Sequence, residues 1–443
     1  MLRMGPPYFE RARDYYLSGI PRGRATLNTV VSHRYVIVGN GFAGTTCAEQ
    51  LRKADPACSI VLFADEPYCL YNRIALPPML RKQVTEQKVI MRDVAWHQKL
   101  NIDLRLSTRV DTLNVAEKTV VANGSEEPFD ALLLATGGRP NPSTAPGALG
   151  AGNVYNFQYM DDTKAISHAL ETAKVAVAVG GSFIAYELAE AFVSRGVETH
   201  WLIRGPRFLR RMLDEMAGEL LHDAARADGV HLHFGEEVRE LVRSNGAVSK
   251  LVTTSGETIE TDLVGIGLGL TINMELCEGT PIRTRTGIIT DEHLETDVAG
   301  IFAAGDAAEF YDPIAEQHYR MGTWNSAGAH GKLAAHNMAA YANGGERKIF
   351  DTVPEYSSLV FSGQTITQFG LSPEYRDDIE TEMHVEKDKG WYRALYFLDD
   401  RFVGAVLIGK GNRAGKRRYL EAIKTKARFP KESRRELLSW TAE

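Results

Sequence analysis

The stretch Arg34-Tyr35-Val36-Ile37-Val38-Gly39-Asn40-Gly41-Phe42-Ala43-Gly44 decides the fold of this chain of 443 residues. In it a short apolar, β-rich run ends directly in a Gly-x-Gly-x-x-Gly turn. Residues 43–53 then have the pattern of a helix, and the apolar run 59–63 predicts the next strand. Together these segments predict a strand–turn–helix–strand unit of the kind that binds a dinucleotide.

Each glycine of this turn is needed for a different physical reason. Gly39 permits the tight turn, Gly41 lets the backbone approach a pyrophosphate, and Gly44 lets the helix pack closely on the strand. The free N–H groups at the N-terminus of the helix then attract the phosphates. Because Phe42 and Ala43 lie within the same turn, we expect the whole turn to contact the cofactor.

Three further motifs follow in order along the chain. They are Leu134-Ala135-Thr136-Gly137-Gly138, a second glycine turn at Gly180-Gly181-Ser182-Phe183-Ile184-Ala185, and Gly305-Asp306. One glycine turn alone is weak evidence, but the ordered set predicts two bound dinucleotides, FAD at the first turn and a nicotinamide cofactor at the second. The chain is therefore expected to move electrons from NAD(P)H through a flavin.

The second glycine turn belongs to a complete unit of its own. The strand 175–179 precedes it, a helix over 183–195 and a strand over 199–203 follow, and the apolar run 262–267 ends the unit. Because residues 296–306 resemble the closing motif of the first unit, the sequence predicts an α/β fold in which the second of two Rossmann-like domains is inserted in the first. Alternating short strands from about residue 352, with a helix after Lys416, predict a C-terminal α+β domain.

These patterns set the expected domain limits. They are 1–33 for an N-terminal extension, 34–150 and 275–350 for the FAD-binding domain, 151–274 for the NAD(P)H-binding domain, and 351–443 for the C-terminal domain with a basic tail.

Acidic residues expected to contact the flavin cofactor follow the strands of the first unit. Asp65 and Glu66 both lie where an acid would accept hydrogen bonds from the adenosine ribose, and the choice between them is open. Two roles are also open for Asp306. Its carboxylate could accept hydrogen bonds from the ribitol chain of a flavin, or it could cap the helix that follows.

The second turn departs from the strict pattern. Ser182 stands where the second glycine is expected and Ala185 where the third is expected. Alanine is tolerated at the third position, but serine at the second crowds the pyrophosphate unless the backbone shifts.

The end of the second strand of this unit bears on the choice between NADH and NADPH. An NADH site needs an acid there, whereas this chain has Ile203, followed by arginines at 204, 207, 210 and 211. Arginine suits a 2′-phosphate by its charge and its forked donors. We therefore expect NADPH, with NADH possible; the alternative is that these arginines form an ordinary basic surface loop.

The motifs as a set resemble the FAD-dependent pyridine nucleotide-disulfide oxidoreductase family, from about residue 34 to 410. The segment Glu66-Pro67-Tyr68-Cys69-Leu70-Tyr71-Asn72-Arg73-Ile74-Ala75-Leu76 is similar to a loop of nitrite reductase flavoproteins and of rubredoxin and ferredoxin reductases. Thr323-Trp324-Asn325-Ser326-Ala327, with Gly331, resembles the helix start that meets the flavin pyrimidine edge. Residues 399–409 resemble part of the interface domain of the same subgroup, which implies that role for the C-terminal domain.

The resemblance implies roles for single residues. Arg73 would lie near the flavin, Phe183 would be the aromatic lid that nicotinamide displaces, and Glu187 would be the carboxylate near flavin N5, so these three are the predicted catalytic residues. Relatives often carry a lysine near position 78 to pair with that Glu, but Pro77-Pro78 stands here and Arg73 is the candidate substitute.

The predicted contacts divide between the two cofactors. Those with FAD are Gly39, Gly41, Phe42, Ala43, Gly44, Asp65, Glu66, Arg73, Val110, Ala135, Thr136, Gly137, Arg139, Gly305, Asp306, Thr323 and Trp324. Those with NADPH are Gly180, Gly181, Ser182, Phe183, Ile184, Ala185, Glu187, Arg204, Arg210 and Gly267.

Composition limits the remaining classes of function. A net charge of -6 argues against general nucleic-acid binding, and no apolar run is long enough to span a bilayer. The four cysteines lack the spacing of metal ligands, and His231 and His233 alternate on a predicted strand without a further ligand nearby in sequence. We therefore expect a cytoplasmic protein with neither a metal site nor a disulfide framework.

Three destinations for the electrons are open. The leading one is a small acidic electron-carrier protein of ferredoxin or rubredoxin type, which the basic residues between Lys410 and Arg435 could steer. The second is a disulfide, peroxide, sulfur species or oxygen, with Cys69 as the reactive thiol. The third is a redox-sensing or assembly flavoprotein with slow hydride chemistry. A homodimer is possible.

Overall fold

The computed structural model describes residues 32–412 and 415–438. The chain divides into two units at residue 33, and the description below concerns the unit that begins there. Only the last two positions of the predicted N-terminal extension, residues 32 and 33, are among the described residues. Arg413 of the basic tail also lies outside them.

A five-stranded parallel sheet contains the strand that leads into the first glycine turn. Its strand order is β19-β7-β1-β2-β3. The strands are β1 (Arg34–Val38), β2 (Ser59–Phe63), β3 (Asp103–Arg105), β7 (Ala131–Leu134) and β19 (Ile301–Ala303). Because β19 follows the whole second unit in sequence and yet pairs with β7, the chain returns to this sheet, and the predicted insertion of one Rossmann-like domain in the other is confirmed.

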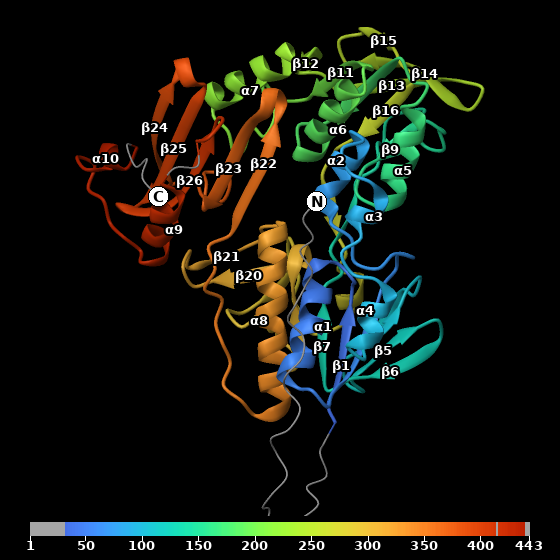
Figure 1. Cartoon of the computed structure of the whole chain (residues 1–443), viewed down its shortest axis with the longest axis vertical. Helices are drawn as coiled ribbons and strands as arrows, with labels where there is room; N and C mark the ends of the chain where they lie inside the picture. Colours follow the sequence, from blue (N-terminus) through green and yellow to red (C-terminus); the bar gives the residue numbers. More distant parts are fainter. Residues whose placement is uncertain (1–31, 413–414, 439–443) are drawn as a thin grey trace, which may run out of the picture. The chain divides into compact units, whose positions relative to one another are not determined.

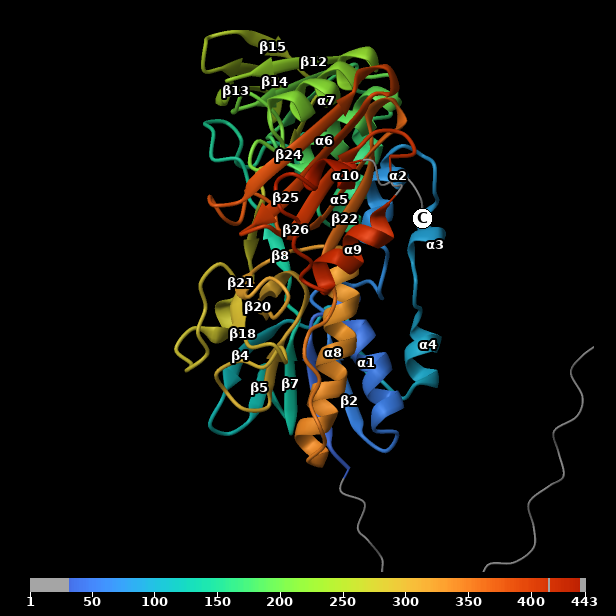
Figure 2. The ribbon, with the colours of Figure 1, turned by 90° about the vertical axis from the view of Figure 1, so that its left-hand side faces the viewer.

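Two long helices lie side by side along this sheet, as both Figure 1 and Figure 2 show. They are α1 (Phe42–Ala54) and α8 (Trp324–Asn343). Their backbones come so close that a Cβ atom added at Gly331 would lie only 2.4 Å from the carbonyl oxygen of Ala43. This close packing holds the start of α8 against the first glycine turn.

Smaller elements surround this sheet. Two strand groups follow the orders β4-β5-β6 and β18-β20-β21, and β8 pairs with β17. The strands are β4 (Val110–Asn114), β5 (Thr119–Ala122), β6 (Ser125–Pro128), β8 (Gly138–Pro140), β17 (Leu270–Ile272), β18 (Ile288–Thr290), β20 (Ala308–Asp312) and β21 (Gln317–Tyr319). The helices are α2 (Leu76–Leu80), α3 (Glu86–Val89) and α4 (Val94–Lys99).

The inserted unit contains a second five-stranded parallel sheet, of order β12-β11-β10-β16-β9. The four buried residues that end β10 form a continuous apolar run, as expected of a strand covered on both faces. The strands are β9 (Val154–Asn156), β10 (Val175–Val179), β11 (Glu198–Ile203), β12 (Val230–Phe234) and β16 (Leu263–Ile266), with β13 (Val238–Ser244), β14 (Ala247–Thr253) and β15 (Thr258–Glu260) in a separate antiparallel group. The helices are α5 (Met160–Ala169), α6 (Phe183–Ser194) and α7 (Glu215–Ala227).

The C-terminal part is an antiparallel sheet of order β22-β23-β26-β25-β24 with two helices, visible in Figure 2. Its elements are β22 (Glu355–Val360), β23 (Gln364–Gly370), β24 (Glu380–Glu386), β25 (Trp391–Leu398), β26 (Arg401–Ile408), α9 (Lys416–Lys424) and α10 (Arg434–Leu438). The predicted α+β class of this part is confirmed. The sequence did not indicate β24, because this edge strand is mostly polar and exposed.

Three side chains connect the inserted unit to the C-terminal part. Tyr186 donates to the carbonyl oxygen of Leu359. Asp228 accepts from both the backbone N–H and the hydroxyl of Ser362, at 2.6 and 2.7 Å. Asp214 accepts from the Tyr392 hydroxyl at 2.8 Å. These contacts hold the C-terminal sheet against α6 and against both ends of α7.

Candidate functional site

The first glycine turn is closed on one side and open on the other. Gly39 has a φ of +114°, and a Cβ atom there would lie 2.1 Å from the carbonyl oxygen of Ala135. A Cβ atom at Gly44 would lie 1.9 Å from the carbonyl oxygen of Gly39. At Gly41, by contrast, an added Cβ atom would meet no heavy atom within 4 Å. The open side therefore has the room that a pyrophosphate needs, and the turn fits a dinucleotide.

Asp306 provides a second test of the fit to FAD. It lies in a single 3₁₀ turn, Gly305–Ala307, that has no side-chain cap, so the structure does not show the capping role. Burial raises the pKa of its carboxyl group, while Arg73 and Arg320 oppose that shift. Within the described chain no hydrogen bond satisfies this carboxylate, as expected of an acceptor meant for a polyol.

The structure distinguishes the environments of Asp65 and Glu66. Glu66 is occupied: it accepts from Arg73 Nη2 at 2.5 Å and from the Tyr71 hydroxyl at 2.6 Å. Asp65 is exposed and lies 3.7 Å from Arg109 Nη1 in a loose ion pair. Asp65 is therefore the carboxylate that can turn toward a ribose.

Arg73 is held by Glu66 and Gln158 rather than by Glu187. Besides its ion pair with Glu66, its Nη1 donates to the carbonyl oxygen of Gln158 at 2.8 Å. Its guanidinium lies 4.9 Å from the ring centre of Tyr71 and 5.2 Å from that of Tyr159. The hypothesis that Arg73 pairs with Glu187 is therefore wrong, because Arg73 already has a complete set of partners elsewhere.

Arg81 takes the place that was assigned to Arg73. It follows α2 directly and forms a half-buried ion pair with Glu190, one helical turn along α6 from Glu187. Burial raises the pKa of Glu187 to about 8; Arg81 lowers it and Glu190 raises it further. Sequence reasoning missed Arg81 because it looked for the cation near position 78, where two prolines start the short helix.

A cavity of about 900 Å³ lies along the second glycine turn. It is lined by every predicted NADPH contact except Ala185, which is fully buried beneath the turn. Ser182 does not disturb the turn: its hydroxyl donates to the carbonyl oxygen of Gly267 at 2.7 Å and accepts from the N–H of Ala185 at 3.4 Å. Serine thus caps α6 at the position where glycine was expected.

Aromatic and acidic side chains meet at one end of this cavity. The ring of Phe183 lies 4.1 Å from the ring of Tyr356, which the C-terminal sheet contributes. Glu187 and Thr323 line the same cavity, so the first turn of α6 and the start of α8 face a common space. Tyr356 was not predicted, because its partner Phe183 is far away in sequence.

The arginines after β11 differ in their partners. Arg207 donates to the carbonyl oxygen of Leu213 at 2.7 Å and so stabilises its own loop. Arg204 is exposed, with its Nε 3.2 Å from Glu237 in a surface ion pair. Arg204 and Arg210 both line the cavity, as Glu187 does. Arg204 and Arg210 can therefore meet a ligand's phosphate in this cavity, and Arg211 of the same loop lines it too.

The remaining predicted FAD contacts surround the first turn. Trp324 stacks on Phe42 with ring centres 4.0 Å apart, and Thr323 caps α8 by accepting from Ser326 N at 3.1 Å. Thr136 donates to the carbonyl oxygen of Asn273 at 2.6 Å. Two further predicted contacts are placed differently: Arg139 forms an exposed ion pair with Glu275, and Val110 is buried where β4 begins.

The alternative redox centre, Cys69, is half-buried in the segment before Arg73. Burial raises the pKa of its thiol, and Asp93 raises it further, so the thiolate is disfavoured.

In the part of the chain that the structure describes, no cluster of histidine, cysteine or acidic side chains has the arrangement of a metal site. Within the same residues, no helix has the length and apolar character needed to cross a membrane.

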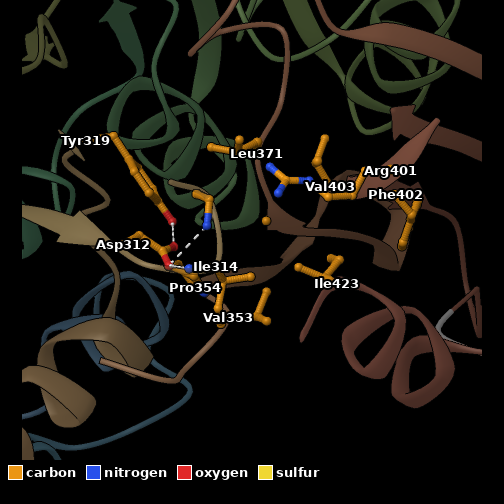
Figure 3. Close-up of a pocket in the computed structure, with 12 residues that line it drawn as sticks. Asp312, Ile314, Tyr319, Val353, Pro354, Leu371, Arg401, Phe402, Val403 and Ile423 are labelled. Atoms are coloured by element: carbon orange, nitrogen blue, oxygen red, sulfur yellow. Dashed lines mark hydrogen bonds between the residues drawn. The ribbon is translucent and has the colours of Figure 1, made fainter. Parts of the chain in front are cut away.

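A second cavity, shown in Figure 3, lies between β20 and the C-terminal sheet. Its only acid, Asp312, accepts from the Tyr319 hydroxyl and from Ile314 N, each at 2.8 Å. Apolar side chains such as Leu371 and Ile423 make up most of the rest. Because its polar groups already have partners, this cavity is part of the packing and not a ligand site.

Many of the basic residues of the tail are paired within the chain. Lys426 and Lys416 bind Glu316 and Glu355, at 2.5 and 2.6 Å. The buried Arg434 is paired with Glu380 at the start of β24 and with Asp400 in the turn between β25 and β26, each at 2.8 Å. The free positive charge of this region is therefore smaller than its sequence indicates.

The comparisons with known proteins agree with this geometry. The family model described as pyridine nucleotide-disulphide oxidoreductase matches residues 33–331, and the chain belongs to this family. It is thus an FAD-dependent NAD(P)H oxidoreductase, which confirms the resemblance.

Particular relatives and solved structures define the similarity further. The chain is 29% identical over 390 residues to a nitrite reductase [NAD(P)H] of Bacillus subtilis, a match that covers 85% of this chain but only 46% of that protein. It is 31% identical over 307 residues to the ferredoxin–NAD(+) reductase component of an anthranilate 1,2-dioxygenase system from Burkholderia cepacia, covering 69% of this chain and 75% of the relative. The structure of the covalent putidaredoxin reductase–putidaredoxin complex matches with a TM-score of 0.82 and 22% identity, over 92% of this chain and 99% of that chain.

Proposed function

We propose that this protein passes electrons from NADPH through FAD to a small acidic electron-carrier protein of ferredoxin or rubredoxin type. The observation that carries the proposal is the single cavity of about 900 Å³ that joins the second glycine turn to Phe183, Glu187 and the start of α8. A dinucleotide lying along that turn would place its reactive ring beside the residues of the first domain.

The residues around the first turn would hold FAD. The open backbone at Gly41 suits the pyrophosphate, Asp65 the ribose and Asp306 the ribitol chain. When bound, the flavin would accept a hydride from the nicotinamide and pass the electrons onward singly. The start of α8 would bring its free N–H groups and its positive end toward that site.

The side chains of this protein would control access and charge. Phe183 lines the cavity with its ring tilted against that of Tyr356, and it would move aside when a nicotinamide ring enters. Glu187, with a pKa of about 8, holds a proton at neutral pH and so adds no negative charge there. Arg81 is a positioning residue that acts through Glu190 and Glu187.

The preference for NADPH is part of the proposal. Arg204 and Arg210 line the cavity, and β11 ends in Ile203, where an NADH site would carry an acid. Two arginines six positions apart were also introduced in an engineered water-forming NADPH oxidase derived from the Lactobacillus brevis NADH oxidase. Arg204 and Arg210 have the same spacing, which supports a 2′-phosphate site.

The proposed acceptor rests on the relatives and on the cysteines. Several relatives are named as ferredoxin or rubredoxin reductases. The raised pKa of Cys69 gives no support to a thiol route. We also propose a cytoplasmic location, which agrees with the four free cysteines.

Anaerobic titration of the FAD-loaded protein with NADPH tests the proposal. We expect the flavin absorption to bleach completely at about one equivalent per flavin, and a ferredoxin or rubredoxin to restore it quickly. A requirement for about two equivalents, with a long-wavelength thiolate band on the way, would show that a cysteine also cycles. Slow bleaching that no carrier protein reverses would instead favour a redox-sensing flavoprotein.

A further inference from the structure

Gln368 has a buried amide group without a partner. It lies in β23 with only 4% of its surface exposed, and its Nε2 atom makes no hydrogen bond to any residue of the described chain. Burial of an unpaired amide is unfavourable, so such groups normally bond to something. Because Gln368 lines the cavity of about 900 Å³, a ligand in that cavity is the available partner.

The strand register places Gln368 beside the aromatic lid. It pairs with Tyr356 across the antiparallel strands β22 and β23. Directly opposed residues project from the same face of a sheet, with Cβ atoms about 4.5–5.5 Å apart. Since the ring of Tyr356 lies against that of Phe183, Gln368 belongs to the same wall of the cavity, on the side of Glu187, whose charge acts on Tyr356.

The chemistry of a free primary amide defines its complement. It offers N–H donors and a carbonyl acceptor side by side, and another primary amide matches both at once. A half-turn of the Gln368 amide exchanges the two atoms but still presents one donor and one acceptor. At this end of a nicotinamide dinucleotide, the ring carries one such group, its carboxamide.

We propose that Gln368 binds the carboxamide of the nicotinamide ring through a reciprocal pair of hydrogen bonds. The C-terminal sheet would then supply a specificity-determining residue of the hydride-donor site. This inference rests on the proposed reduction of FAD by NADPH. It explains why a polar side chain without a partner occupies a buried position in β23.

The test compares two hydride donors with the FAD-loaded protein. One is NADPH, and the other is its reduced 3-acetylpyridine analogue, which keeps the carbonyl group but carries a methyl group in place of the amide nitrogen. Stopped-flow absorption gives the flavin reduction rate divided by the apparent Kd for each donor. The value for NADPH divided by the value for the analogue is the discrimination ratio. Intrinsic differences between the two donors cancel when this ratio is compared across variants.

Two substitutions should move the ratio in opposite directions. Gln368→Leu removes the bonds to the amide, so we expect the ratio to fall about three- to tenfold. Gln368→Glu can accept from the carboxamide N–H but repels a carbonyl oxygen, so the ratio should rise. A disturbance of packing alone would affect both donors alike and would leave the ratio constant.

Gln364→Leu is the matched control on the same strand. Its side chain accepts from Lys410 N at 3.1 Å and lies outside the lining of the cavity, so its ratio should equal that of the wild type. Wild-type ratios in both Gln368 variants, at unchanged FAD content, would overturn the assignment of Gln368 alone. If neither donor reduces the wild-type flavin, the proposed function fails and this inference fails with it.

Discussion

The Glu187 carboxyl group is a buried acid that keeps its proton at neutral pH. Its pKa rises from 4.5 to about 8 because burial disfavours the charged form. Between these two values the folded protein holds a proton that the unfolded chain has released, so the free energy of unfolding falls as the pH rises through that window.

Replacing this acid should therefore stabilise the protein at the upper end of the window. For Glu187→Gln we expect a gain in thermal midpoint over the wild type that is smallest near pH 4.5, grows up to about pH 8 and is constant above it. Thermal unfolding of both proteins across this range measures the difference. Glu49→Gln is a control with the opposite effect on the thermal midpoint. Its pairing with Lys53 lowers the pKa of Glu49, so losing this carboxylate should lower the midpoint. A gain independent of pH would contradict the raised pKa.

The arginines of the loop after β11 carry a prediction about cofactor choice. Arg204→Ala and Arg210→Ala should each raise KM for NADPH by about tenfold to a hundredfold, because each removes a charge-assisted hydrogen bond to the 2′-phosphate. KM for NADH, which lacks that phosphate, should hardly change. Steady-state kinetics with both donors measures the ratio of the KM for NADPH to the KM for NADH.

Arg207→Ala provides the control for this loop. Its guanidinium donates to the backbone at Leu213, so its loss should lower the thermal midpoint without changing the ratio of the two KM values. Equal effects of Arg204→Ala on both donors would assign that arginine to the loop surface instead.

At the level of elements, the turn before α1 separates a structural role from a binding role. A methyl group at Gly41 meets only open space, whereas one at Gly44 overlaps the backbone of Gly39. We expect Gly41→Ala to lower the free energy of unfolding of the FAD-free protein by less than about 1 kcal/mol, the cost of a poorer helix cap, while FAD affinity falls at least about tenfold.

The neighbouring substitution gives the contrast. Gly44→Ala should cost at least about 2 kcal/mol in the absence of FAD, because helix and strand must move apart. Urea unfolding and FAD titration of both variants supply the measurements. Equal FAD affinity of Gly41→Ala and wild type would place the pyrophosphate elsewhere.

The same elements show what a sequence can predict. Strands such as β1, β2 and β10 were predicted within a residue, because each is an apolar run with clear turn signals. The polar edge strand β24 carries no such signal. Likewise, the glycine turns were visible as local patterns. Arg81, Tyr356 and Gln368 face the cavity or its acids only through pairings between distant segments, so local patterns could not indicate them.

At the level of the whole molecule, the contacts between the inserted unit and the C-terminal part determine how the cavity is closed. Asp228 at the end of α7 accepts two hydrogen bonds from Ser362. Asp228→Ala should therefore accelerate hydrogen exchange at the Ser362 amide and lower the free energy of unfolding by about 1–2 kcal/mol.

A neighbour on the same helix serves as the comparison. Asp223 is paired with Arg226 at the surface, and Asp223→Ala should leave exchange at Ser362 unchanged. Hydrogen-exchange mass spectrometry of the segment 355–363 reads out both variants. If the two behave alike, Asp228 does not hold the C-terminal sheet against α7.

The pairing of β19 with β7 has a consequence for how the protein is made. The first sheet cannot be completed until the ribosome has synthesised the entire inserted unit, whereas the strands of that unit are all available earlier. The inserted unit can therefore fold first on the emerging chain, while the first sheet waits with an unpaired strand edge. During synthesis, the unit in the middle of the chain thus folds before the sheet whose strands begin the sequence.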